Sequence, residues 1–234
     1  MKLRVVTLFP EILSGYMQSS IMAKAVAGGR ITYDVLNLRP FGTGKHRTCD
    51  DTPFGGGAGM VLKPEPLAAA LDSIGAAGKR VIYPTPSGKP FDQKIAQELS
   101  REDELVFICG RYEGIDQRII DTYVDDELSI GDYVISSGEI ASLVIIDAVY
   151  RLLDEVISAE SLVEESFADG LLEYPQYTRP AEFNGHSVPD VLLSGNHARI
   201  ADWRHQQRVA RTRDNRPDLL AAYYQSKGDQ HGRD

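Results

Sequence analysis

Apolar and polar positions alternate along the chain in short segments rather than in long repeats. Apolar runs bounded by polar or turn-forming residues are typical of buried strands, and the chain has them at 3–7, 31–36, 80–83 and 105–109. Helical periodicity lies between or after these runs, at 21–27, 64–74, 92–99 and 115–122. Strands that alternate with short helices favour an α/β domain built on a parallel sheet.

The strongest helical pattern covers residues 139–157, which contain no Gly or Pro. Its apolar residues cover more than one face, so we expect the helix to be buried on both sides. One side could contact the core and the other a second subunit. Burial within one subunit explains the pattern equally well.

The composition and the periodicity of the sequence change after this helix. Residues 158–165 are acidic and weakly periodic, and residues 166–189 are rich in Tyr, Pro and Gly, which is typical of irregular loop. Helical patterns return at 198–213 and 218–225, with Pro217 at a first helical position and a frayed tail beyond. We therefore expect a catalytic α/β domain over 1–157, a flexible linker over 158–166 and a small all-α domain over 167–234.

Composition restricts the function. The 234 residues carry a formal net charge of −9, so a nucleic acid would require a local basic patch. Cys49 and Cys109 show no metal-ligand spacing, which fits a reducing compartment. Pro10 and Glu11 interrupt the first apolar run, which argues against a signal peptide, and no apolar segment is long enough to span a bilayer. These features predict a soluble cytoplasmic protein without a membrane partner.

Two glycine-containing loops suggest a small-molecule site. One is CGRYEGID at 109–116, after the apolar run at 105–109, and the other is SIGDYVISSGE at 129–139. Glycine at a strand end lets the backbone approach a ligand closely, and ligands of open α/β sheets bind outside the carboxyl ends of strands. The sequence thus predicts a pocket built largely from main chain.

A further glycine-rich loop, FGGGAGM at 54–60, lacks the Gly-Lys-Ser/Thr ending of a P-loop and does not follow a strand as a dinucleotide fingerprint would. A loop that admits a flat base against bare backbone fits it better. The basic residues 45–47 precede Asp50 and Asp51. They could contact phosphate beside the glycines or form an ordinary solvated loop.

Arginines outnumber acidic residues between 196 and 216, in contrast to the rest of the chain. Arg204, Arg208 and Arg211 are spaced four and three residues apart, hence on one helical face. This predicts a polyanion site, with a solvated helix face as the alternative. Glu164, Glu165 and Asp169 precede the Tyr/Pro-rich loop and could serve linker solubility or supply a general base.

Together these segments resemble the bacterial tRNA (guanine-37-N1)-methyltransferases, the TrmD family of the SPOUT (trefoil-knot) class. The matching segments are long and ordered, and they comprise LFPE, HRTCDDTPFGGGAGM, CGRYEGID, SIGDYVISSGE, SFADGLLEYPQYTRP and VPDVLLSGNHARIADWR. The resemblance implies a deep-trefoil-knot parallel sheet flanked by helices, S-adenosyl-L-methionine as methyl donor, a tRNA substrate and a homodimer. It also implies use of Mg²⁺, for which the sequence has no visible ligand spacing.

The resemblance assigns three groups of residues. It places the cofactor against the loops that here contain Tyr83, Pro84, Thr85, Pro86, Gly110, Tyr112, Glu113, Ile130, Gly131, Asp132, Tyr133, Val134, Ile135, Ser137 and Gly138. With the basic and glycine-rich patterns, it predicts tRNA contacts at His46, Arg47, Asp50, Gly55, Gly56, Gly57, His197, Arg204, Arg208 and Arg211.

The catalytic roles implied by the resemblance fall on Arg151 and Glu165, the latter standing where the family usually has Asp. Glu165 would take the N1 proton of guanine, with Asp169 and Glu164 as alternative bases, and Arg151 would stabilise negative charge on O6. Two other functions stay open at this point: a non-enzymatic RNA-binding regulator, and a SPOUT ribose 2′-O-methyltransferase.

Overall fold

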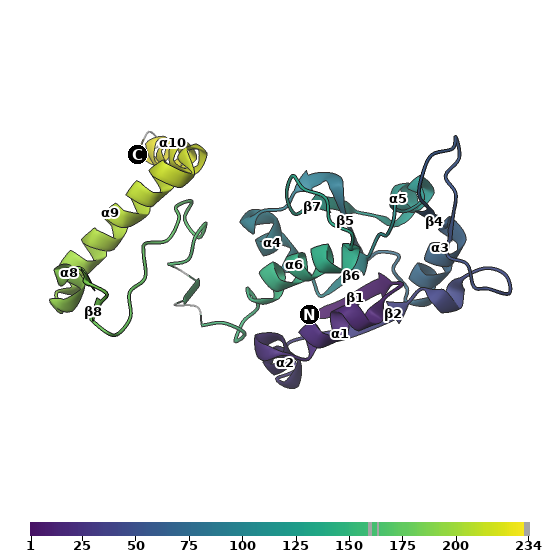
Figure 1. The fold of residues 1–234 in the computed structure, drawn as a ribbon, viewed down its shortest axis with the longest axis horizontal. Helices are drawn as coiled ribbons and strands as arrows, with labels where there is room; N and C mark the ends of the chain where they lie inside the picture. Colours follow the sequence, from purple (N-terminus) through teal and green to yellow (C-terminus); the bar gives the residue numbers. More distant parts are fainter. Residues whose placement is uncertain (159–160, 163, 232–234) are drawn as a thin grey trace. The chain divides into compact units, whose positions relative to one another are not determined.

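The computed structural model describes residues 1–158, 161–162 and 164–231 (Figure 1). The chain divides into two compact units, Met1–Ile157 and Ser158–Asp234. Among the described residues, no helix combines the length and apolar character that crossing a membrane requires.

The first unit is built on a five-stranded parallel sheet with the order β2-β1-β6-β5-β7. Its strands are β1 (Lys2–Thr7), β2 (Thr32–Asn37), β5 (Arg80–Pro90), β6 (Glu104–Ile108) and β7 (Asp126–Ser129). In register, Val5 of β1 pairs with Val35 on one side and Phe107 on the other, and Phe107 pairs with Ile82. The predicted parallel α/β sheet is therefore confirmed.

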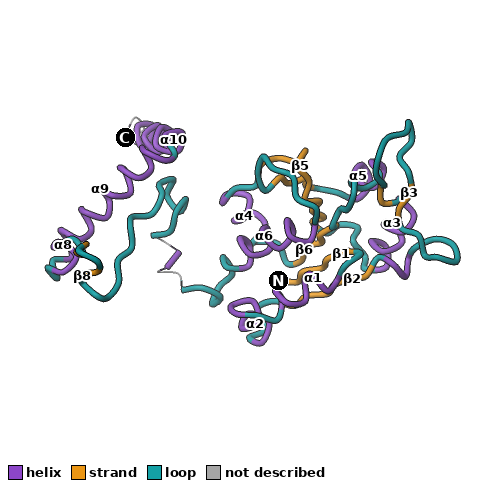
Figure 2. Tube along the Cα trace, viewed as in Figure 1, coloured by secondary structure: helices purple, strands orange, loops and turns teal. Residues whose placement is uncertain are grey.

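Helices flank this sheet on both faces (Figure 2). One layer contains α1 (Pro10–Met17), α4 (Gln93–Leu99) and α6 (Gly138–Tyr150), with α2 (Ser20–Ala27) against α1; the other contains α3 (Pro64–Ser73) and α5 (Gln117–Tyr123). Side chains of β1 alternate between the two layers: Leu3 and Val5 enter one buried cluster and Val6 enters the other. Apolar burial on both faces explains why the strands read as continuous apolar runs.

A helix and a strand of the first unit are among the elements that were not predicted. Helix α1 begins at Pro10, with Glu11 in its first turn, so residues that seemed to interrupt an apolar run instead start a helix. Strand β7 contains Asp126, whose charge hid the strand pattern. Arg80 of the neighbouring β5 donates from Nη2 to Asp126 Oδ1 at 3.1 Å, which explains how a carboxylate is tolerated in this strand.

Two predicted boundaries were wrong. Helix α6 ends at Tyr150 instead of 157, and the chain continues in turns, with Glu155 at a positive φ of 64°. Leu152 and Val156 still pack on the core from these turns, which accounts for the helical-looking pattern. Strand β5 runs on to Pro90, and its pairing with β7 is interrupted at 85–88 by a bulge.

Short elements complete the first unit. The 3-10 turn η1 (Arg39–Phe41) follows β2, and β3 (Asp50–Asp51) pairs antiparallel with β4 (Val61–Leu62). The glycine-rich loop 54–60 connects β3 to β4, so the ends of this loop are joined by a two-stranded ladder.

The second unit contains α8 (Asp190–Leu193), α9 (His197–Asn215) and α10 (Pro217–His231). The Asn196 side chain accepts from the Arg199 amide at 3.2 Å and caps α9. Helix α10 starts at Pro217 as predicted, but extends beyond 225, and residues 232–234 of the expected frayed tail lie outside the described residues. The region expected to be irregular contains an antiparallel hairpin of β8 (Glu182–Phe183) and β9 (His186–Ser187).

Candidate functional site

A pocket of about 280 Å³ lies at the carboxyl ends of β6 and β7, beside residues 83–86 in the middle of β5, where its pairing with β7 becomes irregular. The predicted cofactor-binding residues line it with one exception, since the exposed Asp132 is not among the lining residues. Sequence reasoning did not assign six further lining residues, which are Arg111, Gly114, Leu128, Ser129, Ser136 and Ala141. In the sequence, only position could have indicated them, because each lies within three residues of a predicted cofactor-binding residue.

The pocket wall depends on close contact between two glycines. Gly138 N–H donates to the Gly110 carbonyl oxygen at 3.2 Å. A Cβ built on Gly138 would lie 2.6 Å from the Gly110 nitrogen and 2.7 Å from its oxygen, closer than real Cβ contacts allow. A Cβ on Gly110 would lie 2.9 Å from the Tyr83 ring. Bare backbone at these positions therefore brings the loop after β6 against the start of α6.

Large apolar side chains remain exposed around this pocket. Val134 is 86 % exposed, Tyr112 59 % and Tyr133 55 %, although each lines the pocket. Main-chain groups beside apolar walls suit a flat heterocycle, because backbone groups can hydrogen-bond to its polar edge while side chains cover its faces. The residues present thus fit a nucleoside cofactor such as S-adenosylmethionine.

A buried ion pair connects this pocket to the core. Arg111 Nη2 lies 2.9 Å from Oε2 of Glu139, whose side chain is completely buried, and Arg111 Nη1 donates to the Ser136 carbonyl oxygen at 3.1 Å. Ser137 Oγ donates to Glu139 Oε2 at 2.8 Å, and Thr7 of β1 donates to the other carboxylate oxygen. Glu139 therefore fixes the loop after β6, the start of α6 and the end of β1 together. Sequence reasoning noted Glu139 only as a helix start.

The glycine-rich loop 54–60 lies beside the pocket-lining loop 110–114. Glu113 N–H donates to the Met60 carbonyl oxygen at 3.0 Å, and Leu62 N–H donates to the Gly114 carbonyl oxygen at 3.0 Å. Gly59, at a φ of +89°, packs so closely on Glu113 that a Cβ would lie 2.4 Å from Oε1. These bonds place an end of the predicted tRNA-contacting loop next to the predicted cofactor loop.

The other predicted tRNA contacts in this unit are accessible. His46 and Arg47 are exposed, and Asp50 lies half-buried in β3. Gly55, Gly56 and Gly57 are exposed, and all have positive φ values. Phe54 is fully exposed at the start of this loop. These residues can meet a ligand, but no contact within the protein assigns their role.

Arg151 directly follows α6 and caps its carboxyl end. It is half-buried beside Tyr150, whose pKa is raised by burial, while the hydrogen bond with Tyr16 and the positive charge of Arg151 act in the opposite direction. Tyr16 in turn donates to Asp147. The end of α6 is thus tied to α1, which gives Arg151 a fixed main-chain position.

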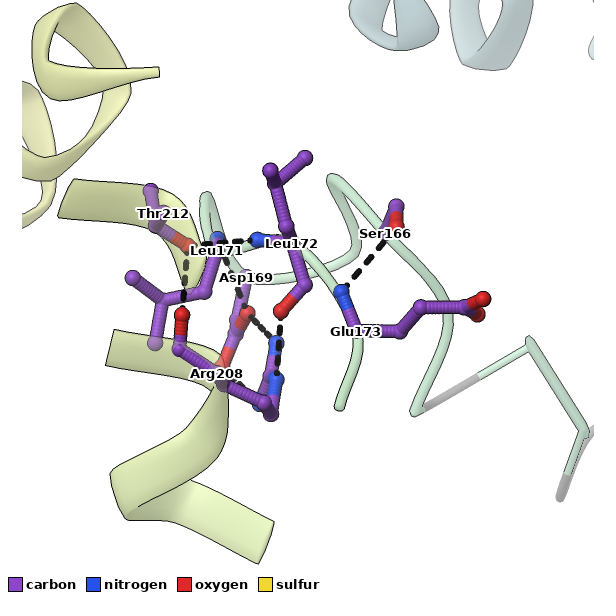
Figure 3. Close-up of polar contacts among 7 residues, drawn as sticks. All are labelled: Ser166, Asp169, Leu171, Leu172, Glu173, Arg208 and Thr212. Carbon is purple, nitrogen blue, oxygen red and sulfur yellow. Dashed lines mark hydrogen bonds and ion pairs between the residues drawn. The ribbon is translucent and has the colours of Figure 1, made fainter. Parts of the chain in front are cut away.

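Two of the three candidate bases are paired with arginines of α9. Glu164 Oε2 lies 3.2 Å from Arg204 Nη1, and Asp169 Oδ2 lies 3.0 Å from Arg208 Nη1 (Figure 3). Burial, the largest single influence, raises the pKa of Asp169, but hydrogen bonds from Arg208 and from backbone amides outweigh it and leave the pKa below its ordinary value. A lowered pKa makes Asp169 a weaker base.

The arginines of the predicted basic face of α9 differ in their exposure to solvent. The side chains of Arg204 and Arg208 are 38 % and 12 % exposed, and both pair with carboxylates of their own unit. Arg211 and His197 are exposed on the same helix. Among the described residues, no three His, Cys, Asp or Glu side chains gather closely enough to hold a metal ion.

Gly138→Ala is expected to weaken cofactor binding, because its methyl group would force the wall at Gly110 apart. Overpacking typically costs about 1–3 kcal/mol, which corresponds to an affinity about 5- to 150-fold weaker. Isothermal titration with S-adenosylmethionine measures the effect. Gly15→Ala is the matched control, since a Cβ there meets no atom within 4 Å. Equal affinity of the Gly138 variant and the parent would contradict the assigned wall.

Comparison with known proteins agrees with this geometry. A family model described as tRNA (Guanine-1)-methyltransferase TrmD matches residues 1–222. The tRNA (guanine-N(1)-)-methyltransferase of Treponema denticola is 64 % identical over 94 % of this chain and 90 % of its own length. The proteins of the same name from Treponema pallidum and Borreliella burgdorferi are 59 % and 54 % identical, over 95 % and 100 % of this chain and 89 % and 99 % of their own lengths. The chain belongs to the TrmD family of tRNA (guanine-1)-methyltransferases, a family of the SPOUT class.

Proposed function

We propose that this protein transfers a methyl group from S-adenosylmethionine to N1 of guanine 37 in tRNA. The single observation that carries the proposal is the main-chain pocket at the carboxyl ends of β6 and β7, beside residues 83–86 of β5, in a chain of this family. The pocket lies where ligands of parallel α/β sheets bind, and its apolar walls fit the flat base of a nucleoside.

The residues that would hold the cofactor come from three loops. Backbone groups of 83–86, 110–114 and 130–138 would read the adenine edge, and apolar side chains such as Ile130 and Ile135 would flank its ring. S-adenosylmethionine supplies a methyl group on a positively charged sulfur, which needs no further activation by the protein. The contribution of the chain is therefore alignment, with N1 held at a near-attack distance of about 3–3.5 Å.

Glu165 and Arg151 carry the remaining chemistry. Guanine N1 bears a proton that must leave before its lone pair can attack, and we assign Glu165 to remove it. As the N1 proton leaves, negative charge develops on O6, where the fixed positive charge of Arg151 would stabilise it. The assignment rests on the family pattern, in which a carboxylate stands at the position of Glu165.

The protein would act as a homodimer with a knotted sheet. Ile140 and Val144 lie four residues apart on one face of α6 and are 46 % and 45 % exposed, an apolar surface that a second copy would cover. Within each copy, residues 1–157 would bind the cofactor, 158–166 would act as a linker and 167–234 would bind tRNA in the cytoplasm.

Transfer of a tritiated methyl group tests the function. Unmodified tRNA with guanine at position 37 should become labelled, whereas the same tRNA with adenine there should not. Binding of S-adenosylmethionine without incorporation would instead support an RNA-binding regulator. Equal labelling of both tRNAs would contradict the assignment of guanine 37 as the methylated nucleobase.

Arg211→Gln is expected to weaken tRNA binding by removing an exposed charge from α9. If Arg211 contacts a phosphate, the log–log slope of affinity against salt should fall by about 1. Filter binding across a salt series measures this slope. Arg118→Gln, a similarly exposed arginine on α5, removes the same charge and should leave the slope unchanged. An unaltered slope in the Arg211 variant would show that Arg211 is not part of the tRNA interface.

A further inference from the structure

Arg208 and Thr212 lie one helical turn apart on α9, and both contact the loop 169–172 (Figure 3). Arg208 Nη1 and Nη2 pair with the two carboxylate oxygens of Asp169, and Nε donates to the Leu172 carbonyl oxygen at 3.3 Å. Thr212 Oγ1 accepts from the Leu172 amide at 2.9 Å. The helix therefore holds both the carboxylate and the main chain of this loop.

This contact is largely closed to solvent. Thr212 and Leu171 are completely buried, and the Arg208 side chain is 12 % exposed. Arginine contacts phosphate through accessible N–H groups, and all three guanidinium nitrogens of Arg208 already have partners in the loop. The geometry of Arg208 is that of an internal anchor.

The anchored loop includes Glu165. Ala168 N–H donates to the Glu165 carbonyl oxygen at 3.3 Å, and Glu173 N–H donates to Ser166 Oγ at 3.0 Å (Figure 3). These bonds close residues 165–173 into one loop, so the contacts with α9 orient the whole segment. The main-chain position of Glu165 therefore depends on those contacts.

The residue before Glu165 is also attached to α9. Arg204 Nη1 lies 3.2 Å from Glu164 Oε2, and the Tyr174 hydroxyl donates to the same oxygen at 2.6 Å. The Arg204 guanidinium carbon lies 4.6 Å from the centroid of the Tyr174 ring. Both ends of the 165–173 loop are thus connected to one helix.

We propose that Arg208 and Thr212 are positioning residues that hold the 165–173 loop on α9 and so present Glu165 to the guanine. This inference rests on the proposed role of Glu165 as the base. Because the same helix exposes Arg211, tRNA binding to α9 and placement of the base would be coupled through one rigid element. Arg208 would then act in turnover and contribute little to tRNA affinity.

A phosphate contact at Arg208 predicts the opposite pattern. Asp169→Asn would remove a competing negative charge and leave tRNA binding unchanged or tighter, without loss of turnover. Arg208→Lys would retain most of the function, since lysine also binds phosphate. A positioning role requires the guanidinium fork, which lysine cannot reproduce against Asp169 and Leu172 together.

Thr212→Val provides the sharpest test, because it removes one hydroxyl and no charge. Leaving the half-buried Leu172 amide without its acceptor should lower kcat about tenfold, while the tRNA Kd, its salt slope and the cofactor Kd stay at parental values. Thr122→Val is the matched control. Its hydroxyl also donates to the carbonyl oxygen four residues earlier, but Thr122 Oγ1 accepts no bond from any loop in the part of the chain that the structure describes.

Two further variants keep the test decisive if the Thr212 variant folds poorly. Asp169→Asn and Arg208→Lys should each lower kcat with little change in tRNA Kd, and circular dichroism should match the parent. In a Glu165→Gln background, Thr212→Val should cost nothing more, because the loop no longer carries a base to position.

Parental kcat in Thr212→Val, Asp169→Asn and Arg208→Lys would overturn the proposal, as would a lowered salt slope in Arg208→Gln. These outcomes are distinct from failure of the proposed function. If Glu165→Gln alone retains full activity, Glu165 is not the base, whatever the loop variants do. If Glu165→Gln is inactive while the loop variants are parental, only the positioning role fails.

Discussion

Glu165→Gln is expected to lower the rate of methyl transfer about 10²- to 10⁴-fold, the range that general bases contribute. The amide keeps the size of the side chain but cannot accept the N1 proton of guanine. Single-turnover kinetics with saturating tRNA and S-adenosylmethionine measure the chemical step directly. The Kd values of both ligands should remain near those of the parent, because the change removes proton transfer and little binding.

Glu165→Asp is the matched control for this prediction. It keeps the carboxylate and introduces the residue that the family usually has at this position, so the rate should stay well above that of the glutamine variant. A glutamine variant as fast as the parent would move the base elsewhere. Glu164 and Asp169 would then be the remaining candidates.

Arg151→Ala is expected to reduce kcat about 10²- to 10³-fold, as removal of one oxyanion-stabilising donor typically does. The cofactor pocket should be unaffected, because Arg151 is not among the residues that line it. Rapid-quench kinetics and a cofactor titration separate the two effects.

Arg151→Lys should fall between the alanine variant and the parent, since it retains the charge without the planar fork. Equal rates for Arg151→Ala and the parent would exclude Arg151 from the reaction. A large loss of cofactor affinity would instead indicate that the end of α6 supports the pocket wall.

The sheet was predictable because its strands are buried on both faces and therefore read as apolar runs, as at 105–109. Strand β7 was not, because Asp126–Ser129 begins with two acidic residues and contains a single apolar one, and Asp126 finds its partner, Arg80, on a strand far away in sequence. Helix α1 was missed because Pro10 and Glu11 suggest a break, yet both residues suit the first turn of a helix.

The pocket loops were predictable from glycine positions, since Gly110 and Gly138 mark places where the backbone packs without a side chain. Their mutual contact was not, because it joins residues from different loops. The same limit applies to α9. Its arginine spacing indicated one basic face, but only the folded unit reveals that Arg208 is directed at Asp169 and that Arg211 is exposed.

The most direct test of the proposed function is to locate the methyl group. Unmodified tRNA with guanine at position 37 would be incubated with the protein and S-adenosylmethionine, digested to nucleosides and fragments, and analysed by mass spectrometry. The account predicts 1-methylguanosine at position 37 and at no other position. A methyl group on a ribose 2′-oxygen, or on any other base, would contradict it.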